Sequence, residues 1–122
     1  MIITYDVLFP LIIYKINNFQ ETDYKTLIKQ LAYHHNKAIS QKCFINIYID
    51  LYHLDDYSNY YLQQIITYVS NYDYTKINSV KIFIDKKNST YLLKTSLYVS
   101  NSVSKIPIEL VELDKPKNWN NK

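Results

Sequence analysis

The stretch from Cys43 to Leu51, which reads CFINIYIDL, decides the fold. From Ile45 onward an aliphatic residue stands at every second position, which is the period of a β-strand with a buried face. Phe44 and Tyr48 add apolar groups to the other face. A strand that is apolar on both faces is typical of parallel sheets, because such sheets are covered on both sides. The stretch therefore predicts a central strand of an α/β domain.

Strand-like and helix-like segments alternate on both sides of this strand. The sequence predicts strands at 2–7, 11–16, 43–51, 80–84 and 106–113, and helices that begin near residues 22, 58 and 89. The order β–β–α–β–α–β–α–β implies one small domain with a mostly parallel five-stranded sheet and right-handed crossovers. Pro107 places the last strand at an edge of the sheet. We expect a single α/β domain over residues 1–113 and a polar C-terminal tail over 114–122.

The first predicted helix carries one apolar stripe with spacings of three and four residues. The residues expected to face the sheet are Tyr24, Leu27, Ile28, Leu31, His35, Ala38 and Ile39. The adjacent His34 and His35 point to different faces of a helix, so they do not form a pair of metal ligands. We expect one of these two imidazoles on the apolar stripe and the other in solvent.

The composition excludes several classes of site. The 122 residues are 48% hydrophobic, which suits one buried core, and they include no glycine and no arginine. Glycine-rich phosphate loops and bidentate guanidinium clamps are therefore absent from the sequence. Abundant Ile, Asn, Lys and Tyr are typical of an AT-rich genome, so the 14 tyrosines are not by themselves a stacking surface.

Apolar runs and cysteine usage predict the location of the protein. No apolar run is long enough to span a bilayer, and the start of the chain does not resemble a signal peptide. The lone Cys43 cannot form an internal disulfide, and beside a predicted strand it is expected to be a packed thiol. We expect a soluble cytoplasmic protein without a membrane span.

One acidic cluster follows the central strand. Asp50, His53, Asp55 and Asp56 stand at the C-terminal end of this strand, where open α/β sheets usually place their sites. Metal binding or acid–base chemistry uses these residue types, but helix capping and solvated loop carboxylates explain them more simply. No catalytic motif is recognisable, so we expect no enzyme activity, no cofactor and no metal site.

The segment order and two stretches resemble the STAS domain, the fold of anti-anti-sigma factors, SpoIIAA-like proteins and a lipid-binding branch. The stretches are 17–31 (NNFQETDYKTLIKQL) and 45–62 (INIYIDLYHLDDYSNYYL). After its central strand the family typically carries Asp-Ser-Ser/Thr-Gly-Leu, where a serine is the regulatory phosphorylation site. Asp56, Ser58 and Leu62 match in part, although Asn59 and Tyr60 replace the glycine and the spacing is two residues longer. The resemblance implies a phosphorylated Ser58, whereas the residues alone suggest a helix N-cap.

These observations predict a non-enzymatic STAS-like domain, regulatory or for assembly, that binds a protein partner or forms a homodimer through the loop and helix at 55–69. The candidate partner and phosphorylation loop comprises Asp55, Asp56, Tyr57, Ser58, Tyr60 and Tyr61. Exposed tyrosines are enriched at protein interfaces. Two alternatives stay open, a nucleic-acid-binding module that uses Lys and exposed Tyr, and a small-ligand or lipid-binding domain.

Overall fold

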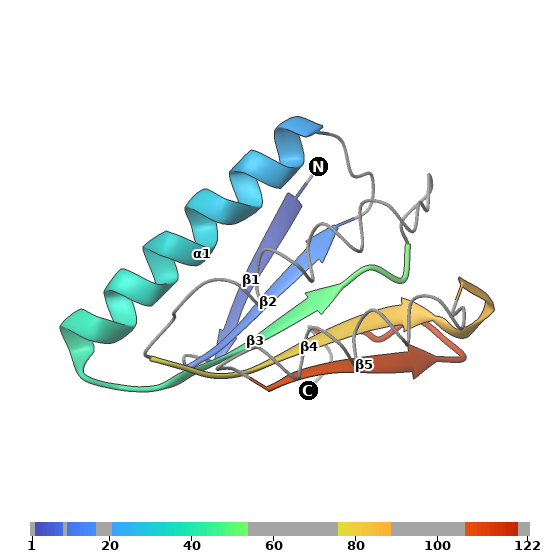
Figure 1. Cartoon of the computed structure of the whole chain (residues 1–122). Coiled ribbons are helices and arrows are strands. Elements are labelled where there is room, and N and C mark those ends of the chain that lie inside the picture. Colours follow the sequence, from blue (N-terminus) through green and yellow to red (C-terminus); the bar gives the residue numbers. More distant parts are fainter. Residues whose placement is uncertain (1, 9, 17–20, 54–75, 89–106, 120–122) are drawn as a thin grey trace.

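The fold is described by a computed structural model covering residues 2–8, 10–16, 21–53, 76–88 and 107–119 (Figure 1). Its elements are β1 (Ile2–Leu8), β2 (Leu11–Ile16), α1 (Glu21–Gln41), β3 (Ile45–Asp50), β4 (Ile77–Asp85), a 3-10 turn (Lys86–Asn88) and β5 (Ile108–Leu113). The helices predicted to begin near residues 58 and 89 lie outside the described residues.

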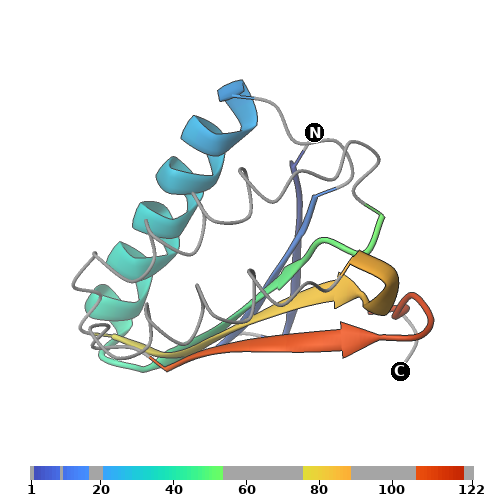
Figure 2. The same cartoon turned by 45° about the vertical axis from the view of Figure 1, so that its right-hand side comes forward.

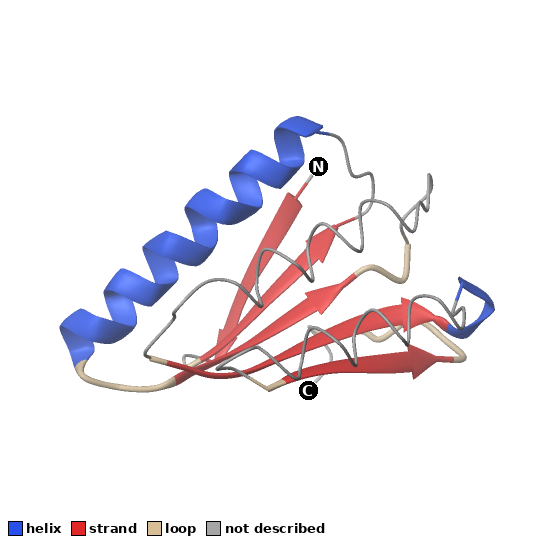
Figure 3. Cartoon of the chain, in the orientation of Figure 1, coloured by secondary structure: helices blue, strands red, loops and turns tan. Residues whose placement is uncertain are grey.

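The strands form one sheet in the sequential order β1-β2-β3-β4-β5. β1 pairs antiparallel with β2, and β2 to β5 are parallel neighbours (Figure 3). The predicted α/β class and mostly parallel sheet are therefore confirmed. β5 stands at an edge of the sheet, as Pro107 predicts, and the Pro107 carbonyl accepts the Val80 N–H at 3.0 Å.

One face of the sheet forms the core, and α1 lies over this face (Figure 2). The strand register aligns four apolar side chains into a row across the parallel strands. This row is Ile12, Ile47, Val80 and Ile108. All four are buried, and Leu27 and Leu31 of α1 belong to the same cluster. Cys43 packs against the cluster as a half-buried thiol, as expected.

The start of the central strand differs from the prediction. The expected strand began at Cys43, but β3 begins at Ile45. Phe44 precedes the strand and is 58% exposed, with the Lys76 ammonium 4.8 Å from its ring centroid. Phe44 is therefore not part of a second apolar face of the strand. A cation over the exposed ring is the contact that the structure gives it.

The inward face of α1 is rotated from the predicted stripe. Among the described side chains of α1, at residues 25–41, the buried ones are Leu27, Leu31, His34 and Ala38, with spacings of four, three and four residues. The side chain of Tyr24, which was also predicted to face inward, is not among those described. Ile39 was expected to face the sheet but is 46% exposed, and His35 is half-buried. His34 is the buried imidazole because Tyr14 of β2 supplies a polar partner inside the core. The Tyr14 hydroxyl lies 2.5 Å from His34 Nδ1.

A Lys residue takes a position at the end of α1 that usually needs glycine. Lys42 has a φ of 55°, in the left-handed region. The Lys42 N–H donates to the Ile39 carbonyl and the Cys43 N–H donates to the Ala38 carbonyl, both at 3.1 Å. These are the two hydrogen bonds of a Schellman motif, which satisfies carbonyls at a helix end. The helix α1 therefore ends in a Schellman motif, with Lys42 at the position where glycine is most common.

Replacing Lys42 by Gly is expected to raise the free energy of unfolding by about 0.5–1 kcal/mol. The substitution removes the left-handed penalty of about 1–2 kcal/mol, and the greater freedom of glycine in the unfolded chain offsets part of the gain. Urea denaturation followed by circular dichroism measures the change. The matched control is Ser40→Gly in the last helical turn, which is expected to destabilise the protein. Destabilisation by Lys42→Gly would contradict this account of the helix end.

Candidate functional site

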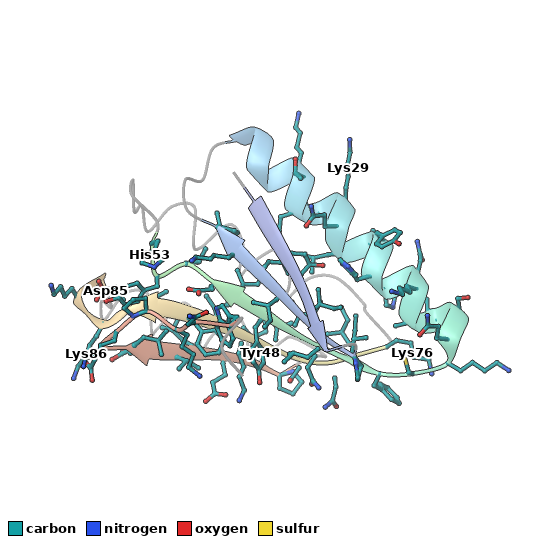
Figure 4. The ribbon with its side chains drawn as sticks, turned by 180° about the vertical axis from the view of Figure 1, so that it is seen from behind. Lys29, Tyr48, His53, Lys76, Asp85 and Lys86 are labelled. Carbon is teal, nitrogen blue, oxygen red and sulfur yellow. The ribbon has the colours of Figure 1, made fainter. Side chains whose placement is uncertain are left out.

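The candidate site lies where the parallel strands end. β3, β4 and β5 finish at the same edge of the sheet, and this edge is the usual place for sites in open α/β sheets. Figure 4 shows His53, Asp85 and Lys86 at this edge and Lys76 at the opposite one. Residues 50–53, 85–87 and 114–119 meet here. We call this group of residues the carboxyl edge.

Asp50 ends β3 and is held by two hydrogen bonds. Its side chain is 1% exposed. Oδ1 accepts the Tyr52 backbone N–H at 2.9 Å, and Oδ2 accepts the Trp119 indole N–H at 2.7 Å. A buried carboxylate needs such donors, because burying an unpaired charge is costly. Asp50 therefore joins the end of β3 to the C-terminal segment.

Asp85 ends β4 in the same manner. Its Oδ1 accepts the Lys87 backbone N–H at 3.0 Å, two residues further along the chain. Both aspartates thus form an Asx turn directly after a strand, which fixes the path of the chain away from the sheet. Asp85 differs in being half-buried. The two acids stabilise neighbouring turns, which is the role that their contacts assign them.

Tyr52 lies between two segments of the carboxyl edge. Its hydroxyl donates to the Asp114 carbonyl at 3.3 Å, and its ring meets the exposed His53 ring edge-to-face with centroids 5.1 Å apart. Partial desolvation, then the carboxylates of Asp85 and Asp114, raise the pKa of the Tyr52 phenol above its ordinary value of 10.0. The phenol therefore stays protonated, and a donor, to higher pH than a free tyrosine.

The stability of the protein is expected to fall above about pH 10, and part of this fall belongs to Tyr52. Well below pH 10 the phenol is protonated in both the folded and the unfolded state. Above this pH the unfolded chain releases the proton first, so the unfolded state gains stability until the folded pKa is passed. Urea denaturation between pH 8 and pH 11 should give a shallower decline for Tyr52→Phe than for the unaltered chain. Equal declines would contradict the raised pKa.

Trp119 lies within the predicted polar tail at 114–122, and no role for it was predicted from the sequence. In the structure the Trp119 ring packs against Phe83 and Tyr48, with centroids 5.2 and 5.7 Å apart. The Lys117 ammonium lies 5.2 Å from the Trp119 centroid. The available signal was the residue type, because Trp is highly buried on average and this chain has one.

The predicted site residues fall into two groups. Asp55, Asp56, Tyr57, Ser58, Tyr60 and Tyr61 lie outside the described residues. Asp50 and His53 lie on the carboxyl edge, but Asp50 is buried and hydrogen-bonded while His53 is exposed. Within the described ranges no three His, Cys, Asp or Glu side chains are grouped so as to hold a metal ion.

The helix that the structure describes does not combine the length and apolar character that a bilayer crossing requires. Comparison with protein-family models, with curated proteins and with solved structures gives no significant match.

Proposed function

We propose that this chain is a non-enzymatic protein-interaction domain, STAS-like in its role, that binds its partner at the carboxyl edge and through the adjoining residues 55–69. The observation that carries the proposal is the burial and hydrogen bonding of Asp50. This acid ends the central strand, yet it is 1% exposed and both of its oxygens accept hydrogen bonds. Its geometry suits a structural anchor, whereas a general base needs access to a substrate proton.

The exposed groups around Asp50 have the composition of an interface rim. His53 is exposed beside the half-buried Tyr52, and the exposed Lys86 lies 3.9 Å from an Asp114 carboxylate oxygen. Rims of protein interfaces are polar and solvent-accessible, and aromatic residues are enriched nearer their centres. An ion pair this exposed contributes about 0–1 kcal/mol, so a partner can rearrange it at little cost.

The position of β3 supports the STAS-like form of the proposal. β3 is the middle strand of the five and delivers the chain to the carboxyl edge at His53. The stretch that resembles the family's phosphorylation loop follows in the sequence within five residues, at Ser58. A phosphate on Ser58 would add charge beside Asp55 and Asp56, and this repulsion would change the binding surface. Recognition by a protein partner would then depend on phosphorylation.

The test is affinity purification of the tagged chain from its native cells, with mass spectrometry of the bound proteins. The first variant replaces Tyr57, Tyr60 and Tyr61 by Ser. The matched control is Tyr33→Ser on α1, which removes a tyrosine that is 64% exposed and far from residues 55–69 in the sequence. A stoichiometric partner that the triple variant loses and the control retains is the expected result. An unchanged set of partners would refute the assignment to residues 55–69.

A second candidate function is binding of single-stranded nucleic acid, and one specific observation favours it. Lysines stand over aromatic rings on the face of the sheet away from α1. The Lys81 ammonium lies 5.8 Å from the Tyr48 centroid and the Lys117 ammonium 5.3 Å from the Phe83 centroid. Positive grooves with aromatic side chains bind single strands without sequence preference. Anisotropy of a labelled oligonucleotide at two salt concentrations tests this, and no binding at low salt refutes it.

A further inference from the structure

On the face of the sheet opposite α1, the Asp50 carboxylate lies beside the aromatic side chains of Tyr48 and Phe83. Every second residue of β3 and of β4 points to this face. Among them are Tyr48 and Asp50 of β3 and Phe83 of β4. The side chains of Asp50 and Phe83 are 1% and 3% exposed. Tyr48 and Phe83 meet edge-to-face with centroids 5.1 Å apart, and Figure 4 shows Tyr48 on the side away from α1. We call Tyr48, Asp50 and Phe83 the aromatic site.

Trp119 occupies the aromatic site with three contacts that together select an indole. Its ring lies at 70° to the Phe83 ring and at 55° to the Tyr48 ring. Its N–H points at Asp50 Oδ2 across 2.7 Å. Phenylalanine cannot donate that hydrogen bond, and a hydrogen bond to a charged acceptor is among the stronger kinds. A flat apolar ring with one N–H is therefore the ligand chemistry that this geometry fits.

Lys117, two positions before Trp119, also contacts the aromatic site, so the bound motif is a short peptide and not the indole alone. Its ammonium lies 5.3 Å from the Phe83 centroid and 5.2 Å from the Trp119 centroid, so it stacks over a ring of the site and a ring of the occupant. Cations over aromatic faces contribute to recognition in this way. The bound motif is a basic residue two positions before a tryptophan.

Two further contacts of the C-terminal segment lie in exposed positions. Asp114 pairs with Lys86 at 3.9 Å between exposed side chains, and its carbonyl accepts the Tyr52 hydroxyl at 3.3 Å in an exposed position. Exposed ion pairs are worth about 0–1 kcal/mol. Trp119 thus anchors residues 114–119 to the sheet, and a tryptophan of a partner has to compete with it against the high local concentration of a residue in the same chain.

We propose that Tyr48, Asp50 and Phe83 form an indole-binding site that Trp119 fills within the chain, and that a partner segment with a basic residue two positions before a tryptophan fills this site in exchange. The aromatic site shares Asp50 with the carboxyl edge, but the proposed exchange does not rest on binding at residues 55–69. The ligand assigned to the face of the sheet opposite α1 has the chemistry of the segment of the chain that is bound there.

The experiment uses the full chain with Trp119→Ala, which empties the site. The probes are indole and 1-methylindole, which lacks the N–H, together with an acetylated and amidated Lys-Asn-Trp peptide and its Ala-Asn-Trp counterpart. Calorimetric titration is expected to show saturable binding of indole, with 1-methylindole bound at least about tenfold more weakly. The Lys-Asn-Trp peptide is expected to bind more tightly than its alanine counterpart.

Several outcomes would overturn the proposal. A folded variant that binds no indole, or that binds indole and 1-methylindole equally, would refute the indole site. Equal affinity of the two peptides would refute the basic position of the motif. If Trp119→Ala does not fold, the hydrogen bond is tested in Trp119→Phe, which keeps a ring against Tyr48 and Phe83 but lacks the indole N–H that Asp50 Oδ2 accepts. This variant is expected to unfold at a lower urea concentration than the unaltered chain, and equal stability would refute the selection of an indole. If the unaltered chain forms a dimer and the Trp119 variant does not, the site binds a second copy of the chain. This result would overturn the assignment to a different partner.

Discussion

Ile47→Ala is expected to lower the free energy of unfolding by about 2–5 kcal/mol. Ile47 lies in the middle strand, is fully buried and stands in register between Ile12 and Val80. Strands on both sides hold the backbone in place, so the cavity left by the missing methyl and methylene groups cannot close by a small shift. Urea denaturation followed by far-ultraviolet circular dichroism measures the loss.

The matched control for this prediction is Ile39→Ala, the same change on the exposed side of α1. Ile39 is 46% exposed, and alanine is the better helix former, so the control is expected to change stability by less than about 1 kcal/mol. A loss at Ile39 as large as that at Ile47 would mean that the face of α1 packed against the sheet has been assigned incorrectly.

Asp50→Ala is expected to cost about 2–3 kcal/mol and to release Trp119 from the sheet. The substitution leaves the Tyr52 backbone N–H and the Trp119 indole N–H without their acceptor. The chain has one tryptophan, so its fluorescence reports directly on this contact. A shift of the emission to longer wavelength is expected together with the loss of stability.

Asp85→Ala is the matched control. It separates the turn that Asp50 stabilises from the hydrogen bond that Asp50 accepts from Trp119. Asp85 ends a neighbouring strand with the same turn, but its carboxylate is half-buried and its turn bond is to Lys87. Its removal is expected to cost about 1 kcal/mol and to leave the tryptophan emission unchanged. If Asp50→Ala also left the emission unchanged, the Trp119–Asp50 hydrogen bond would not anchor the C-terminal segment.

The strands could be predicted from the sequence because their side chains alternate between two environments. The alternation of Ile45, Ile47 and Ile49 is a local signal that does not depend on any distant residue. The parallel sheet followed from the helical pattern before this strand and from the strand pattern at 80–84. The predicted strand ends were less accurate. β4 begins at Ile77, where residue 80 was predicted, and β3 begins at Ile45, where residue 43 was predicted.

The errors and omissions arose where distant residues decide the outcome. His34 faces inward because Tyr14, twenty positions earlier in the chain, provides its partner. No periodicity within the helix contains that information. Trp119 reaches Asp50 across 69 positions, and the polar residues around it predict an unbound tail. The candidate site changed accordingly, because Asp50, which was predicted to belong to a cluster of helix caps or solvated loop carboxylates, is buried and hydrogen-bonded to Trp119.

The sequential order of the strands has a consequence for the assembly of the protein during translation. Every strand from β2 onward pairs with the strand that precedes it in the sequence. The template for each new strand has therefore left the ribosome before the strand itself, and no strand has to insert between two others that are already paired. Domains that fold during synthesis begin at the N-terminus, and this order lets the sheet grow in one direction. Trp119 comes after all five strands and closes against a completed surface.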